Sequence, residues 1–149
     1  MKKWKKHLFI VSTLIIAMLF FKLCTNPELR IRQFVNRHEE NLYTIAEPYL
    51  EGEKYFLGEY EIYKGVTVKG LQKEEHPVVE FFYSGKGIVP SGVYYGFYYS
   101  PDDVPVAIMD EGCLLTSVAQ DEWEWNGYGD NGGRTKRIKE NWFYYECWF

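Results

Sequence analysis

Hydrophobic side chains recur every three or four residues beyond Asn26, and this spacing predicts one amphipathic helix. Its start is indicated by Asn26, whose side chain can accept hydrogen bonds from backbone amides, followed by Pro27 and Glu28. Pro48 and Gly52 are expected to end it. The apolar stripe consists of Ile31, Phe34, Val35, Leu42, Ile45, Ala46 and Tyr49.

After Gly52 the hydrophobic pattern changes to a period of two, which is typical of strands. The later segments are rich in valine and aromatic residues and are bounded by Gly, Pro, Asn and Asp. Gaps too short for crossover helices favour antiparallel pairing. The segments are 60–69, 77–85, 92–100, 104–109, 113–119, 123–125 and 141–149. We therefore expect an α+β domain, with one helix packed on a curved antiparallel meander, an architecture of the cystatin-like kind.

The first 24 residues combine a lysine-rich start with an apolar run, as a membrane anchor does. Residues 1–7 contain four lysines, and the run Leu8–Cys24 is interrupted by only three polar residues. As a helix this run is about 25 Å long, the short end of what spans a bilayer. Positively charged flanks stay in the cytoplasm. The pattern predicts a cytoplasmic tail (1–7), a transmembrane helix (8–24) and an extracytoplasmic domain (27–149).

Two other processing routes start from the same kind of segment. A cleaved signal peptide needs small residues at its cleavage site, and a lipoprotein needs a small residue before the lipid-bearing cysteine. Leu23 and Cys24 supply neither, so the uncleaved anchor is favoured over cleavage or lipidation of Cys24.

The predicted outer domain is acidic, with twelve basic and twenty-one acidic side chains and a net charge of −9 over residues 27–149. Such a charge, without a basic run, argues against nucleic acid as a partner. A solvated acidic surface that aids solubility is the plain interpretation. Attraction of cationic peptides or wall-bound cations is the functional alternative.

The segment GYGDNG, residues 127–132, matches the glycine spacing of dinucleotide-binding proteins. It lacks the βαβ context, because too few residues follow it for a second strand with an acid for the ribose. Calcium ligation by Asn126, Asp130 and Asn131 is the rival hypothesis, but the spacing of a calcium loop is absent. We predict a glycine-rich hairpin turn and no cofactor.

Two histidines and one acidic motif are candidate catalytic groups. His38 falls on the apolar helix stripe, and His76 precedes a strand, so a His38–His76–carboxylate site would lack a recognisable nucleophile or metal-ligand spacing. The motif SPDD, residues 100–103, is typical of a turn between strands.

The aromatic residues of segments 92–100 and 141–149 exceed what one buried face requires, because neighbours on a strand point to opposite faces. One face should be core. The other either packs as well or presents stacking rings to a glycan or a protein. The candidate ligand-binding residues are Tyr95, Tyr98, Trp142, Tyr144, Tyr145 and Trp148.

Cys113 and Cys147 both fall in the predicted outer domain. An oxidising exterior permits a disulfide between them, which would add roughly 3–4 kcal/mol by closing the intervening loop.

Two segments, YYGFYYSPDDVPVAIM and GDNGGRTKRIKENWFYYECWF, resemble small membrane-anchored proteins of Gram-positive bacteria. The resemblance implies a location and a single outer domain, and it brings no activity, ligand or catalytic residue. We therefore predict a membrane-anchored extracytoplasmic binding module with a protein or glycan partner, not an enzyme. The alternatives are a cell-wall-associated hydrolase using His38 or His76, and an immunity or inhibitor protein of the envelope.

Overall fold

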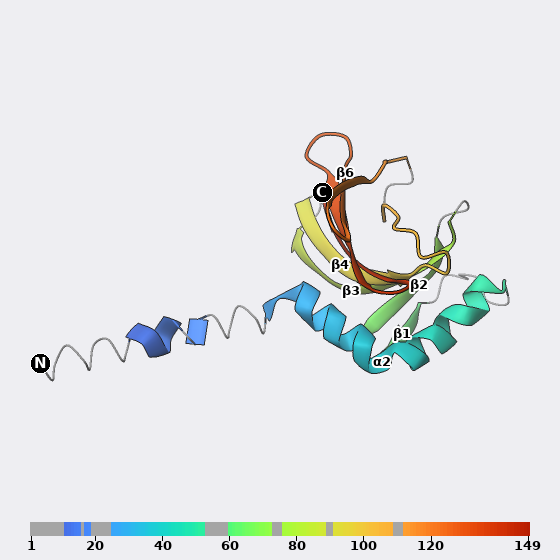
Figure 1. Ribbon diagram of the computed structural model, residues 1–149, viewed down its shortest axis with the longest axis horizontal. Helices are drawn as coiled ribbons and strands as arrows, with labels where there is room; N and C mark the ends of the chain where they lie inside the picture. Colours follow the sequence, from blue (N-terminus) through green and yellow to red (C-terminus); the bar gives the residue numbers. More distant parts are fainter. Residues whose placement is uncertain are drawn as a thin grey trace, which may run out of the picture.

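In the residues that the structure describes, one helix and one antiparallel sheet make up the domain, which confirms the α+β class (Figure 1). The computed structural model describes residues 11–15, 17–18, 25–52, 60–72, 76–88, 91–108 and 112–149. The elements are α2 (Pro27–Leu50), β1 (Glu61–Tyr63), β2 (Val66–Gln72), β3 (Val78–Ile88), β4 (Ser91–Tyr99), β5 (Thr116–Ala119), β6 (Glu122–Asn126), β7 (Gly132–Lys139) and β8 (Trp142–Trp148).

Helix α2 starts as predicted. The Asn26 side-chain oxygen accepts hydrogen bonds from the amides of Glu28, at 2.9 Å, and Leu29, at 3.5 Å, with proline in the first turn. Its end differs slightly from the expectation, because Pro48 lies inside the helix, which continues to Leu50. Gly52 follows with a φ of 73°, a backbone conformation that glycine adopts without strain.

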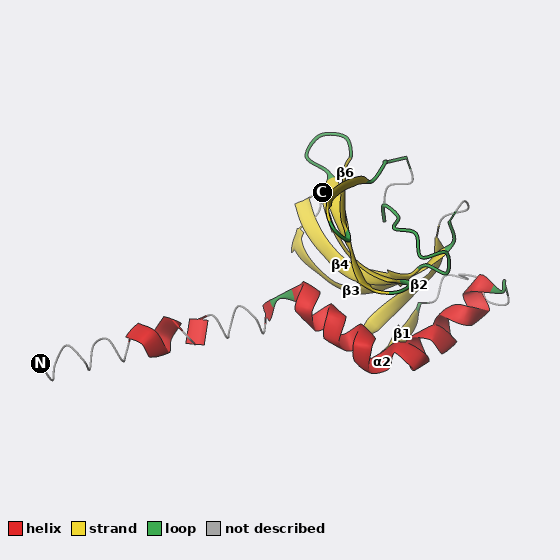
Figure 2. Ribbon diagram, viewed as in Figure 1, coloured by secondary structure: helices red, strands yellow, loops and turns green. Residues whose placement is uncertain are grey.

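The described strands form one sheet in the order β1-β2-β3-β4-β8-β7-β6-β5. All neighbours are antiparallel, as expected, but β4 pairs with β8 and not with the next strand along the chain, so the sheet is not one continuous meander. The sheet bends sharply, α2 lies along the outside of the bend, and the segment after β4 lies inside it (Figure 2). Strand β8 therefore occupies the middle of the sheet and joins the meander β1–β4 to the meander β5–β7.

Several strand predictions need correction. Segment 60–69 is not one strand but the hairpin β1–β2, turned at Lys64 and Gly65, which have φ values of 49° and 84°. Segment 113–119 forms a strand only from Thr116. Strand β7, at residues Gly132–Lys139, is not among the predicted segments. Residues 104–107 have no regular secondary structure.

The irregular path of 104–107 has a physical cause. Pro105 has no amide hydrogen to donate, and the Val106 amide donates to the Tyr98 hydroxyl at 3.0 Å instead of to a strand. Val106, Ala107 and Ile108 are nevertheless buried. This segment therefore acts as a cover for the sheet and not as part of it.

Each face of the sheet has its own hydrophobic cluster. Under α2, the helix stripe packs on alternate residues of β2, β3, β4 and β8, with Phe81 and Phe97 stacked at 4.9 Å. On the other face, segment 106–108 packs on β3, β4, β6 and β8, with Tyr98 and Phe143 stacked at 5.2 Å. The central strands β4 and β8 are therefore covered on both sides.

The predicted anchor falls mostly outside the described residues, as does the basic tail of residues 1–7. Its described parts, 11–15 and 17, 18, are helical, and Val11, Leu14, Ile15 and Met18 are exposed there. Within the described ranges, no helix has both the length and the apolar character needed to cross a membrane.

Candidate functional site

Most of the aromatic residues predicted to bind a ligand lie in the core. Tyr98 is fully buried, and Trp142, Tyr144 and Tyr145 are each 1% exposed. Because both faces of β4 and β8 are covered, these four rings form no surface platform. Tyr95 and Trp148 are partly buried on the face that α2 covers.

The surplus of rings has a structural use, since several lie flat against glycines on neighbouring strands. A Cβ built on Gly96 would lie 2.5 Å from the Tyr145 ring, and one on Gly132 would lie 2.8 Å from Trp148. Gly133 stands in the same relation to Trp125, at 2.4 Å. Rings that cover strand glycines in this way supply the packing that the missing side chains do not.

A polar group is buried beside these rings. The Tyr145 hydroxyl donates to the Glu80 carboxylate at 2.6 Å, and Glu80 is 5% exposed. Burial raises the pKa of Glu80, while the Tyr145 hydrogen bond and the charge of Lys69 partly oppose that rise. Glu80 and Tyr145 are both buried, so the pair is part of the core.

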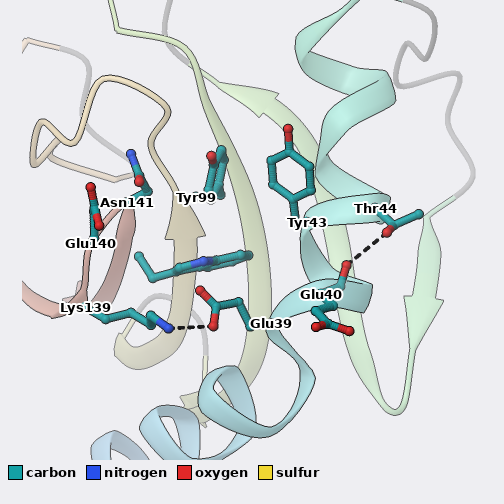
Figure 3. Close-up of a pocket in the computed structure, with 9 residues that line it drawn as sticks. Glu39, Glu40, Tyr43, Thr44, Tyr99, Lys139, Glu140 and Asn141 are labelled. Atoms are coloured by element: carbon teal, nitrogen blue, oxygen red, sulfur yellow. Dashed lines mark hydrogen bonds and ion pairs between the residues drawn. The ribbon is translucent and has the colours of Figure 1, made fainter.

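The candidate site is a pocket of about 530 Å³ between the second half of α2 and the β7–β8 turn (Figure 3). We call it the acidic pocket. Residues from distant parts of the chain line it: Glu39, Glu40, Tyr43, Thr44, Tyr99, Lys139, Glu140, Asn141 and Trp142. An ion pair between Glu39 and Lys139 joins α2 to β7 at its edge.

Aromatic rings form one wall of the acidic pocket. Tyr43 from α2 meets Tyr99 from β4 edge to face at 5.6 Å, and Tyr99 meets Trp142 at 5.0 Å. Tyr43 is 42% exposed, whereas Trp142 is anchored in the core. The pocket therefore has a fixed aromatic base and one accessible ring.

The charge of the acidic pocket is negative, since three glutamates face one lysine. Lys139 pairs with Glu39, and among the described residues neither Glu40 nor Glu140 forms an ion pair. The pKa of Tyr99 is raised by burial first and then by nearby Tyr43 and Glu140. Tyr43 has a raised pKa as well, mainly because its hydroxyl donates to Glu47 at 3.2 Å. Both phenols thus stay neutral at ordinary pH.

The two histidines have different surroundings. His38 contacts the rings of Phe34 and Tyr63, whereas Nδ1 of His76 lies 3.7 Å from the Asp102 carboxylate. Within the described part of the chain, no group of three or more His, Cys, Asp or Glu side chains could bind a metal ion. Among the described residues, His38 and His76 therefore share no metal-binding group, and a hydrolase site at either histidine stays a hypothesis.

The two segments predicted to be turns, GYGDNG and SPDD, both form turns. Residues 127–131 of GYGDNG connect β6 to β7, closed by a 2.9 Å hydrogen bond from the Gly127 amide to Asn131, with Gly129 at a φ of 75°. SPDD turns the chain after β4, and Asp103 there has a φ of 56°.

Cys113 and Cys147 both lie in the cluster on the inner side of the bend, and they are thiols with no disulfide between them in this structure. Cys147 lies 3.5 Å from the carbonyl oxygen of Ile108, and burial raises its pKa. Their pairing under oxidising conditions stays a prediction.

Sequence reasoning missed most of the acidic pocket. Of the six aromatic residues predicted from the sequence to bind a ligand, Trp142 alone lines the acidic pocket, and that prediction does not include Tyr43 or Tyr99. One feature of the sequence could have indicated this pocket. Tyr43 is an aromatic residue on the polar side of the amphipathic helix, close to the acidic residues Glu39 and Glu40.

Comparison with protein-family models, curated proteins and solved structures finds no match to this chain, so its function has to be inferred from its own residues.

Proposed function

We propose that the protein is a membrane-anchored binding module whose acidic pocket takes a cationic side chain of a peptide or protein partner. The observation that carries this proposal is the combination of aromatic rings with two glutamates that have no ion pair in the described structure. Aromatic faces and carboxylates both attract cations. A pocket of about 530 Å³ has room for one lysine or arginine side chain.

The placement of the domain is the second part of the proposal. The lysine-rich start and the apolar run of residues 8–24 support an anchor with the domain outside. Exposed Val11, Leu14, Ile15 and Met18 give the described part of this run an apolar surface suited to lipid. The cystatin-like layout is an expectation about architecture alone and contributes nothing to the choice of partner.

The net charge of the domain supports a basic partner. With −9 over residues 27–149, the domain attracts cations at long range and speeds their encounter. An immunity or inhibitor protein that neutralises a basic toxin would be one case of this binding mode. A neutral glycan would use the rings without the carboxylates, so dependence on charge separates the two partners.

Calorimetry with the full-length protein in zwitterionic detergent tests the proposal, with trilysine as the probe and triglutamate as its opposite. We expect trilysine to bind and triglutamate not to bind. Tyr43→Ala should weaken trilysine binding about threefold to tenfold, because a partly exposed cation–π contact is worth about 0.5–1.5 kcal/mol.

Charge variants provide the matched control. Glu140→Gln removes one carboxylate from the acidic pocket, and Asp130→Asn removes one from the exposed 127–131 loop. Only Glu140→Gln should weaken binding. An equal loss in Asp130→Asn would mean diffuse attraction to the whole surface, and the pocket would lose its assigned role.

A further inference from the structure

A second pocket, of about 310 Å³, lies between the first half of α2, the β1–β2 turn and β3. We call it the basic pocket. Its lining residues are Arg30, Phe34, Lys64, Gly65, Tyr83 and Ser84. None of them is acidic, which is unusual in a domain whose acidic side chains outnumber the basic ones by nine.

Each of the two cations of the basic pocket lies over an aromatic ring. The Arg30 guanidinium lies 5.8 Å from the centre of the Tyr83 ring, and the Lys64 ammonium lies 5.7 Å from that of Tyr63. Phe34 contacts both tyrosine rings, at 6.1 Å and 6.3 Å. Arg30 and Lys64 are thus attached to one aromatic cluster that bridges α2 and the sheet.

The positive charge of these residues is not offset by the part of the protein that the structure describes. No described carboxylate forms an ion pair with Arg30 or Lys64. The positive charge also affects nearby His38. The pKa of His38 lies below its ordinary value, first because the ring is partly removed from water and then because of the charges of Lys64 and Arg37. A basic spot of this kind on an acidic domain favours an anionic ligand.

We propose that the basic pocket binds a phosphate group, with Arg30 and Lys64 as its cationic partners and the Ser84 hydroxyl as a further donor. A guanidinium donates two parallel hydrogen bonds to phosphate oxygens, and an ammonium adds a point charge. Phe34 and Tyr83 give an apolar wall for the rest of the molecule. A Cβ built on Gly65 meets nothing within 4 Å, so the rim at the turn is open.

The phosphate could come from a lipid headgroup or from a soluble phosphoester. Arg30 lies in the first turn of α2, which follows the proposed anchor almost directly, so headgroups would be within reach. Only the lipid source rests on the proposed anchor. The phosphate site itself is independent of both the anchor and the acidic pocket.

Titration of the full-length protein with inorganic phosphate, in zwitterionic detergent and at matched ionic strength against chloride, tests the site. Lys64→Gln should raise the phosphate dissociation constant at least about tenfold, since one charge-assisted hydrogen bond is lost. Lys86→Gln removes the same charge from an exposed position on β3 outside the pocket and should change nothing. Both positions are exposed, and equal melting temperatures without phosphate will verify that both variants fold.

Absence of phosphate binding by the wild-type protein, or equal weakening by Lys64→Gln and Lys86→Gln, would overturn the site. Repeating the titration in nanodiscs identifies the source. If a lipid headgroup fills the basic pocket, added phosphate will have no effect in discs containing phosphatidylglycerol but will bind in a zwitterionic detergent that carries no phosphate group. If the natural ligand is a soluble phosphoester, added phosphate will bind equally in the two media. Each result supports the site and assigns its ligand.

Discussion

The backbone amide of Asn141 donates to the Asp103 carboxylate at 2.8 Å, across 38 residues of sequence. The same carboxylate pairs with the Arg137 guanidinium, and the Asn141 side chain donates to the carbonyl oxygens of Ser100 and Pro101 at 2.9 Å and 3.0 Å. Two turns, one after β4 and one before β8, are therefore joined beside the central strand pair. Asp103 and Asn141 both have positive φ values, 56° and 63°, which aspartate and asparagine tolerate better than most residues.

We predict that Asp103→Ala lowers the free energy of unfolding by about 2–3 kcal/mol, because a charged acceptor of two hydrogen bonds is lost. Asp102→Ala, at the exposed neighbouring position, should cost less than about 0.5 kcal/mol. Urea denaturation of both variants measures the difference. Similar costs for the two substitutions would show that the junction contributes little.

We predict that Gly96→Ala destabilises the domain by at least about 2 kcal/mol, by overpacking. The added methyl group would lie 2.5 Å from both the Phe81 carbonyl oxygen and the Tyr145 ring, inside the core. Thermal unfolding should show a large drop in melting temperature. Gly129→Asn provides the control, because that exposed turn has open space and asparagine accepts its positive φ.

The burial of Glu80 leads to a prediction about how the stability of the protein depends on pH. Its pKa is raised by burial, so the folded protein keeps the Glu80 proton to a higher pH than the unfolded chain does. The stability from this group is complete below the unfolded pKa, near 4.5, and is lost as the pH rises through the folded pKa.

Glu80→Gln keeps an acceptor for the Tyr145 hydroxyl and removes the charge. We expect it to raise the melting temperature at neutral pH and to leave it near the wild-type value at pH 4. Asp130→Asn, an exposed carboxylate, is the control for a general charge effect. A Glu80→Gln protein that is less stable than wild type at neutral pH would contradict the prediction.

The GYGDNG loop is predicted to be structural only. Asp130→Ala should change the unfolding free energy by no more than about 1 kcal/mol, and added calcium should leave the melting temperature unchanged. A calcium-dependent rise that Asp130→Ala abolishes would instead indicate a metal site.

The proposed anchor leads to a prediction about membrane topology. Protease added to intact cells should remove a C-terminal tag while an epitope at Met1–Lys6 remains protected. Recovery of full-length protein in the soluble fraction would exclude the anchor.

Local patterns explain what was predictable from the sequence. The helix was predicted correctly because its cap, its proline and its apolar stripe are all near neighbours. Strand β7 was missed because Arg134 and Lys136 resemble solvent-exposed residues. Lys136 is in fact only 14% exposed, and it pairs with Glu28 of α2 and with Glu122 of β6.

Long-range relationships could not be predicted. The acidic pocket depends on α2 meeting the β7–β8 turn, and its ion pair joins Glu39 to Lys139 across 100 residues. Periodicity also could not show that both faces of β4 and β8 are covered, so buried rings looked like candidates for binding.

Strand order has a consequence for how the domain is made. Among the described strands, β8 is the last to leave the ribosome, yet it belongs in the middle of the sheet between β4 and β7. Until it arrives, both neighbours have an unpaired edge, and unpaired edges promote association with other chains. The nascent protein is therefore most vulnerable to misassembly until β8 has left the ribosome, and a chaperone that protects it would act on the aromatic edge of β4.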